Sequence, residues 1–230
     1  MKRLTRILTI CFLVSVVGQL MASTTIIPDR TTLNTVLGGG GVTEDFESFS
    51  IANGGAGGVG PGISTLDSTT VFLSQGPGLV IPGFALQGGG LQWNGNGYFG
   101  LPTRTVLMKN LSAFDSETID FTSPVQAFGV DLLAFDGYGF TATAVIYGAD
   151  DTTVLTTVND ISIFGGASIA FLGASDSGGI GKVVLGQDTW PSWAPIIDNL
   201  TFGIIPEPST LLLTALGGLS LLGVARRQRK

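Results

Sequence analysis

The stretch FTATAVIYG, at residues 140–148, shows most clearly what kind of fold the chain adopts. From Phe140 to Tyr147 small polar and apolar positions alternate, as in an antiparallel strand with one buried and one solvated face. Elsewhere between residues 23 and 203, short runs rich in β-branched and aromatic residues alternate with clusters of Gly, Asp, Asn and Pro. This pattern lacks helical periodicity and predicts an all-β sandwich or barrel.

Other segments carry the same kind of strand signal. They are residues 42–49, 68–73, 104–108, 117–121, 126–135, 152–158, 167–173, 180–186 and 195–203. The Gly runs at 38–41, 54–62 and 88–90 predict loops, because glycine tolerates positive φ and weakens strands. With 230 residues, 44% of them hydrophobic, we expect one domain at residues 23–204 between two terminal targeting segments.

Charge is distributed unevenly along the chain. All 17 acidic residues lie between residues 29 and 207, where only four of the 11 basic residues are found, so this part carries a net charge of −13. Such a body repels nucleic acid and anionic lipid surfaces, and we expect no nucleic-acid partner. Its acidity suits divalent cations, but it is also commonplace among exported bacterial proteins.

Two residue types that carry much enzyme chemistry are scarce. The chain has no His, which excludes Ser-His-Asp and Cys-His nucleophilic systems and His-ligated zinc or iron. Its single cysteine, Cys11, lies in the N-terminal apolar run. If that run is removed, the mature protein has no thiol and no disulfide.

The N-terminus has the three parts of a secretory signal. Lys2, Arg3 and Arg6 precede the apolar run ILTICFLVSVV, and the small-residue exit GQLMAS follows. We therefore expect a signal peptide at residues 1–22, cut by signal peptidase after Ala22 or Ser23. The alternative is a retained anchor, and in both cases the body is exported.

The C-terminus, IPEPSTLLLTALGGLSLLGVARRQRK at residues 205–230, is a second membrane signal. The run from Leu211 to Ala225 is uncharged, and with its flanks it predicts a helix of about 30 Å, just enough to span a bilayer core. The positive-inside rule keeps the basic tail in the cytoplasm: Arg226, Arg227, Arg229 and Lys230. Because the basic N-terminus also stays inside, the acidic body must lie outside.

This tail resembles the PEP-CTERM sorting signal of Gram-negative and related bacteria. The resemblance rests on Pro206, Glu207 and Pro208, the apolar segment after them and the terminal Arg226-Arg227. It implies transient membrane anchoring, cleavage near Pro-Glu-Pro by an exosortase, a membrane protease, and delivery to the cell surface or an exopolysaccharide matrix. The same tail is also labelled an ice-binding protein C-terminal motif, although the body's few, irregular Thr pairs do not form an ice-binding array.

The body is similar to the jelly-roll-like domains of PEP-CTERM proteins and, distantly, to carbohydrate-binding modules. The segments EDFESF, SPVQAFGVDL, IGKVVL and IDNLTFG carry this similarity, in that order. It implies a jelly-roll-like antiparallel β-sandwich in which a structural Ca²⁺ bridges the first strand to the last. By position its ligands would be Glu44, Asp45, Glu47 and Asp198, since Ca²⁺ requires hard oxygen ligands. Alternatively, these are solvated acids on strand faces.

Three tryptophans are candidates for contact with a glycan. Trp93 lies at the start of WNGNGY, and Trp190 and Trp193 bracket WPSW. A Trp in a loop offers a flat apolar platform for a sugar ring, whereas a Trp in a sandwich can instead fill the core or an open end. The sequence leaves both roles open.

We expect an exported, non-enzymatic surface or extracellular-matrix protein. The first alternative is a carbohydrate-binding surface module that uses Trp93, Trp190 or Trp193. The second is a secreted hydrolase that uses two paired carboxylates. No pair among the 17 acidic residues stands out in the sequence for that role.

Overall fold

The computed structural model describes residues 23–57, 64–71, 75–88, 91–97, 103, 105–108, 116–134, 139–164, 168–187 and 196–205. Within these ranges the chain forms twelve strands and one short helix. The first elements are β1 (Thr25–Ile26), α2 (Arg30–Val36), β2 (Val42–Glu44), β3 (Ala56–Gly57), β4 (Thr65–Leu66), β5 (Phe84–Gln87) and β6 (Leu91–Asn94). They are followed by β7 (Thr105–Met108), β8 (Glu117–Leu133), β9 (Phe140–Gly148), β10 (Val154–Ile163), β11 (Ile169–Gln187) and β12 (Ile196–Gly203).

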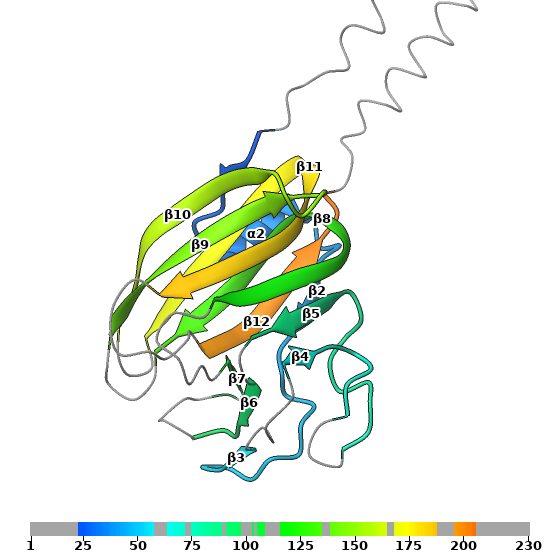
Figure 1. Cartoon of the computed structure of the whole chain (residues 1–230), viewed down its shortest axis with the longest axis vertical. Coiled ribbons are helices and arrows are strands. Elements are labelled where there is room, and N and C mark those ends of the chain that lie inside the picture. Colours follow the sequence, from blue (N-terminus) through cyan, green and yellow to red (C-terminus); the bar gives the residue numbers. More distant parts are fainter. Residues whose placement is uncertain are drawn as a thin grey trace, which may run out of the picture.

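Two long strands, β8 and β11, pair with each other and belong to both layers of the fold. The first part of β8 pairs with β5 on one side and with the last part of β11 on the other. That part of β11 also pairs with β9, and β9 pairs in turn with β10. The second part of β8 pairs with β12 and with the first part of β11. The register of this pair shifts between Ser175 and Ile180. Figure 1 shows both strands turning back there, so that β9 and β10 lie in one layer and β12 in the other.

The main core lies between these two layers. Side chains alternate along β9, where Ala142, Ala144 and Ile146 are buried and the residues between them are partly exposed. Across the core lie Phe128 of β8 and Phe202 of β12. The half-buried strand predicted at residues 140–148 is therefore confirmed, and so is the all-β class.

Helix α2 covers the outer face of the β8, β11 and β12 layer. Its N-cap, Asp29, accepts a hydrogen bond from the backbone N–H of Thr32 at 2.7 Å, which satisfies one of the free amides of the first turn. Leu33 and Leu37 point to the sheet and form a second small core with Ile27 and Ala127. The helix is held by this apolar contact, because seven residues are too few for a helix that is stable alone.

The helix approaches the sheet closely at Gly129 of β8. A Cβ placed on this glycine would lie 2.6 Å from Cδ2 of Leu33 and would overlap the ring of Phe171. We predict that Gly129→Ala lowers the free energy of unfolding by about 1–3 kcal/mol through overpacking. Urea denaturation measures this change, and Gly186→Ala is the control, because a Cβ there has ordinary contact distances. Equal stability of the two variants would contradict the prediction.

Several sequence predictions need correction. The strand predicted at 42–49 ends at Glu44, and the chain then turns through Phe46, whose φ is 54°. In the segment predicted as a strand at 68–73, residues 68 and 69 form a turn, and residues 70 and 71 belong to no strand. The pairs predicted at 117–121 and 126–135, and at 167–173 and 180–186, are the continuous strands β8 and β11. Helix α2 was not predicted from the sequence. Within the described ranges, no helix has the length and apolar character needed to cross a membrane.

Candidate functional site

The last strand, β12, leads directly into the C-terminal segment. Its pairing with β8 ends where Gly203 faces Ala127. Two residues later the backbone N–H of Ile205 donates a hydrogen bond to the side-chain oxygen of Gln126 at 2.9 Å. If β12 continued to pair with β8, a main-chain carbonyl of β8 would accept this N–H. The side-chain oxygen of Gln126 accepts it instead.

Ile205 also packs against the second core. Its half-buried side chain contacts the cluster of Ile27, Leu33, Leu37 and Ala127, whereas that of Ile204 is 59% exposed. We call this cluster, together with Gln126, the Ile205 seat. Most of the seat comes from the first fifteen described residues, so it exists only once that segment has folded onto β8.

Both ends of the described chain lie at one end of the sandwich. Thr25 of β1 faces Ser175, Ser175 faces Ala127, and Ala127 faces Gly203 of β12. Three strand spacings separate the two outer strands, a distance of about 14 Å. Because β1 and β12 run in opposite directions, the chain before Thr25 and the chain after Gly203 leave the sandwich at the same end (Figure 1).

The hydroxyl and carboxylate groups near β1 strengthen this edge. The side chain of Thr24 donates a hydrogen bond to Asp176 at 2.7 Å, and the other carboxylate oxygen of Asp176 accepts one from the N–H of Gly178. Asp176 is 2% exposed. Its carboxylate therefore joins the N-terminal strand to the bend of β11.

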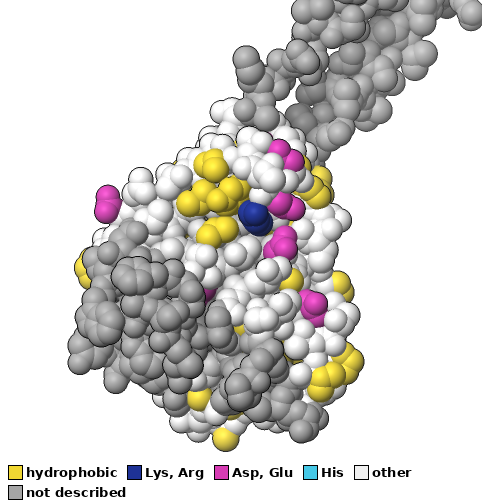
Figure 2. All heavy atoms as spheres, viewed as in Figure 1, with side chains coloured by type: hydrophobic (Ala, Val, Ile, Leu, Met, Phe, Trp, Pro, Cys, Tyr) yellow, Lys and Arg dark blue, Asp and Glu magenta, His cyan; other side chains and the backbone are white. Residues whose placement is uncertain are grey.

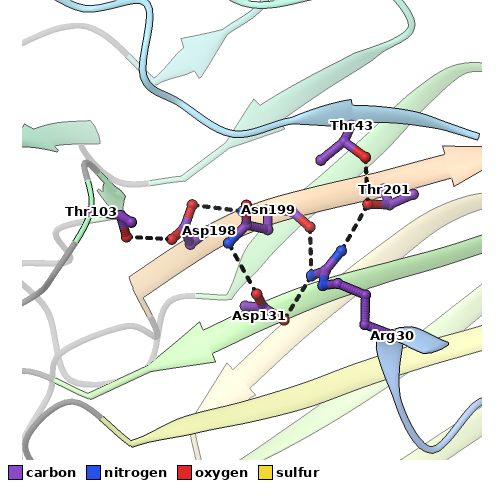
Figure 3. Close-up of polar contacts among 7 residues, drawn as sticks. All are labelled: Arg30, Thr43, Thr103, Asp131, Asp198, Asn199 and Thr201. Carbon is purple, nitrogen blue, oxygen red and sulfur yellow. Dashed lines mark hydrogen bonds and ion pairs between the residues drawn. The ribbon is translucent and has the colours of Figure 1, made fainter.

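A polar network under α2 ties the helix to β8 and β12 (Figure 3). Arg30 makes an ion pair with Asp131 at 2.7 Å, and it also donates to the hydroxyl of Thr201 and the backbone oxygen of Asn199. The side-chain amide of Asn199 donates to the second oxygen of Asp131 at 3.1 Å. A further hydrogen bond, of 2.8 Å, links the hydroxyls of Thr43 and Thr201.

Asp198 lies directly opposite Asp131 and is 3% exposed. Its oxygens accept hydrogen bonds from the hydroxyl of Thr103 and the N–H of Asn199, both at 2.7 Å (Figure 3). Burial is the main reason that the pKa of Asp198 is raised to about 6, and the negative charges of Asp131 and Glu47 raise it further. Each of the four oxygens of the Asp131–Asp198 pair has a protein donor, which fixes the position of both carboxylates.

Of the four proposed calcium ligands, Glu47 lies near enough to Asp198 for its charge to raise the pKa of that side chain. Both oxygens of Glu44 accept backbone N–H groups, from Phe46 and Ile81 at 2.7 Å, and so fix the turn after β2. Asp45 accepts the N–H of Glu47. Among the residues that the structure describes, no three acidic groups are arranged to hold a metal. Calcium binding at these four residues therefore stays a prediction.

Trp93 occupies the core rather than a surface loop. It is 1% exposed and stacks on Phe49, with ring centres 3.4 Å apart and planes 20° apart. The edge contact with Phe46 has ring centres 5.6 Å apart. A sugar ring cannot reach the indole without unpacking this cluster, so the core role of Trp93 replaces its proposed role as a glycan platform.

Glu117, at the start of β8, is another deeply buried acidic side chain outside this network. It is 2% exposed, and neither carboxylate oxygen has a hydrogen-bond partner in the described ranges. Burial raises the pKa of Glu117 well above its usual value. The fold thus favours the neutral form of this side chain, which lies in the sandwich interior.

The outer face of the β8, β11 and β9 layer carries a small mixed patch. Lys182 faces Asp120 and Tyr147 on the neighbouring strands, and its Nζ lies 4.6 Å from the Tyr147 ring centre. Gln87 donates to Asp120 at 3.0 Å. Figure 2 shows apolar side chains next to a basic one on this face, with acidic ones nearby. These opposite charges compensate one another across the strands, as in an ordinary solvated sheet face.

The remaining predicted site residues lie outside the described ranges. They are Pro206, Glu207, Pro208, the proposed membrane helix from Leu211 to Ala225, the basic residues Arg226, Arg227, Arg229 and Lys230, and the tryptophans Trp190 and Trp193. The proposed signal peptide at 1–22 lies outside them as well.

The roles of Arg30, Asp131 and Gln126 were not predicted from the sequence. Two signals pointed to the first pair: Arg30 is the only basic residue between residues 7 and 103, and Asp131 interrupts the apolar run of β8. A charge in such a run is stable only with a partner. Nothing in the sequence distinguishes Gln126 as the partner of Ile205.

The fold defines the described part of the chain as an antiparallel β-sandwich with one short helix. A family model described as the PEP-CTERM protein-sorting motif matches residues 205–230. The chain therefore carries a PEP-CTERM sorting signal, and the resemblance recognised in the tail is confirmed. Its first matched residue, Ile205, is the one held in the seat.

Solved structures resemble the body only weakly. A family 35 carbohydrate binding module from Clostridium thermocellum matches with 10% identity and a TM-score of 0.30, over 44% of this chain and 77% of that chain. The K2 cleaved adhesin domain of Lys-gingipain matches with 13% identity and a TM-score of 0.34, over 70% and 98%.

An isomalto-dextranase from Arthrobacter globiformis T6, complexed with panose, matches with 16% identity and a TM-score of 0.35. The match covers 60% of this chain and only 22% of that enzyme. With TM-scores below 0.5, these likenesses carry no argument about ligand or activity. A search of the curated proteins gives no match.

Proposed function

We propose that this protein is an exported, non-enzymatic surface or matrix component with a jelly-roll-like body, processed by an exosortase at its C-terminal signal. The observation that carries the proposal is the PEP-CTERM motif, which begins where β12 leaves the fold. In this account the C-terminal helix anchors the precursor only transiently, and the cleaved body remains at the cell surface or in an exopolysaccharide matrix.

The arrangement of the two ends supports this topology. An N-terminal export signal and a C-terminal membrane segment must both reach the same membrane while the body folds outside. Thr25 and Gly203 lie in one row across four strands, so both signals extend from one end of the sandwich. The body can therefore fold completely while both ends are still held at the membrane.

A non-enzymatic role is supported by the way the buried carboxylates are used. Glu44 caps a turn, Asp176 ties down β1, and Asp131 binds Arg30. Each of these acids stabilises a particular connection in the fold. Three buried acids that hold connections in the fold support a structural component over a hydrolase.

The carbohydrate-binding alternative now rests on Trp190 and Trp193, since Trp93 is buried. A glycan array with Trp190→Ala and Trp193→Ala tests it, because loss of retention by a folded variant would favour a binding module. No retention of the wild type would favour the structural role.

The sorting step is tested by replacing Pro206, Glu207 and Pro208 with Ala in a host that contains an exosortase. We expect the wild-type chain to be shortened and recovered from the surface fraction, and the triple variant to stay at full length in the membrane fraction. Pro82→Ala, a change at an exposed proline of the body, is the control and should be processed like the wild type. Normal processing of the triple variant would contradict the proposed function.

A further inference from the structure

We propose that the Ile205 seat restrains the sorting motif, so that Ile205 must leave the seat before the exosortase can cleave. This inference rests on the proposed function and adds a positioning role for Gln126. The cleavage chemistry stays with the protease, which hydrolyses a peptide bond with one water and leaves a carboxylate on the body and an amine on the tail. The seat controls how often this peptide bond becomes accessible to the protease.

No spacer residue separates the folded body from the sorting motif. Ile205 is fixed through its N–H by Gln126 and through its side chain by the second core, and Pro206 is the next residue. One residue spans at most about 3.6 Å, so the chain has no spacer between Ile205 and the first proline of the motif. The six steps from Ile205 to Leu211 span at most about 22 Å, which keeps the body close to the apolar run.

An enzyme that binds an extended peptide usually pairs with its backbone N–H and C=O groups on both sides of the cleaved bond. The N–H of Ile205 is already donated to Gln126. While it stays in the seat, this residue cannot pair with the protease and cannot move away from the sheet. The docked and released states of Ile205 are therefore in competition, and only the released state is a substrate.

The seat also connects the two ends of the chain. Ile27, Leu33 and Leu37 come from the segment that follows the N-terminal signal, and they hold the first residue of the C-terminal signal. Close packing of Gly203 supports this arrangement, since a Cβ there would lie 3.2 Å from Leu37 and from Gly41. Folding of the N-terminal segment thus sets how tightly the C-terminal motif is held.

The test follows cleavage of the full chain by pulse-chase in a host that contains an exosortase. Gln126→Ala removes the acceptor for Ile205 and leaves the motif unchanged. Loss of one hydrogen bond shifts the docking equilibrium by about fivefold, so we expect about fivefold faster cleavage. Gln87→Ala is the matched control, because it also removes one hydrogen bond of a glutamine side chain, but on β5. Its cleavage rate should stay within about twofold of the wild type.

A second measurement keeps the proposal testable if Gln126→Ala disturbs folding. Hydrogen exchange of the Ile205 amide in the purified full chain should speed up by about fivefold in Gln126→Ala and stay unchanged in Gln87→Ala. Faster exchange without faster cleavage, or equal cleavage of the two variants, would overturn the restraint. If the Pro206, Glu207 and Pro208 triple variant were also cleaved normally, the proposed function itself would fail.

Discussion

Replacement of Trp93 by alanine is expected to lower the free energy of unfolding by about 3–5 kcal/mol, the usual cost of removing a large buried aromatic side chain. The indole is 1% exposed and contacts the rings of Phe46 and Phe49. Its removal leaves a cavity between the turn after β2 and strand β6, which the rigid strands around it cannot close. Urea denaturation followed by circular dichroism measures the loss.

Trp93→Phe is the matched control, because it keeps an aromatic ring in the same cluster and should lose less than half as much stability. The same proteins separate core packing from ligand contact. If Trp93→Ala kept wild-type stability and lost retention on a glycan array, the core role of Trp93 would be wrong. Trp93 would then act as a platform for a sugar ring, which is the other role that the sequence left open.

Asp198→Asn is expected to stabilise the protein at neutral pH and to leave it unchanged in acid. The pKa of Asp198 is raised from 3.8 to about 6, so the folded state holds its proton more tightly than the unfolded state does. The stability that comes from this proton is complete below pH 3.8 and is lost as the pH rises through about 6. A shift of about two units corresponds to about 3 kcal/mol.

An asparagine at this position keeps both hydrogen bonds of the network. Its oxygen can accept the N–H of Asn199, and its amide can donate to the hydroxyl of Thr103. At pH 7.5 the variant should therefore gain up to about 3 kcal/mol over the wild type, and at pH 3.5 almost nothing. The prediction concerns only the difference in free energy of unfolding between the two proteins. The raised pKa values of Glu44, Glu117 and Asp120 affect both proteins alike.

Asp160→Asn is the control variant, because it also removes one negative charge. Asp160 is exposed and has a φ of 57°, a conformation that asparagine also tolerates. Thermal unfolding from pH 3.5 to 8 should show a stability gain that grows with pH for Asp198→Asn and a much smaller one for Asp160→Asn. A constant difference across this pH range would show that burial does not favour the proton on Asp198.

Local sequence patterns predicted the parts of this fold that local physics determines. The alternation in β9 gave its buried face correctly, and the Pro-Glu-Pro tail was recognised because all its parts lie within 26 residues. Strands β8 and β11 were each divided in two, because Ser123-Pro124 and the Gly178-Gly179 pair look like turns in sequence. In the fold these residues lie at the bend where both strands pass between the layers.

The interactions that hold the two ends of the chain together could not be predicted in the same way. Arg30 and Asp131 are 101 positions apart, and Gln126 and Ile205 are 79 apart, so no local pattern links them. Helix α2 was missed because RTTLNTV contains three threonines and only a short apolar stripe. Its helical state depends on contacts of Leu33 and Leu37 with the sheet.

The most direct test of the sorting account is the intact mass of the protein recovered from the surface fraction of cells with and without the exosortase. We expect cells with the protease to yield a chain that begins near residue 23 and ends near Pro206 to Pro208. Cells without it should keep residues 209–230 on a membrane-bound protein. A surface protein that still ends at Lys230 when the exosortase is present would contradict the account.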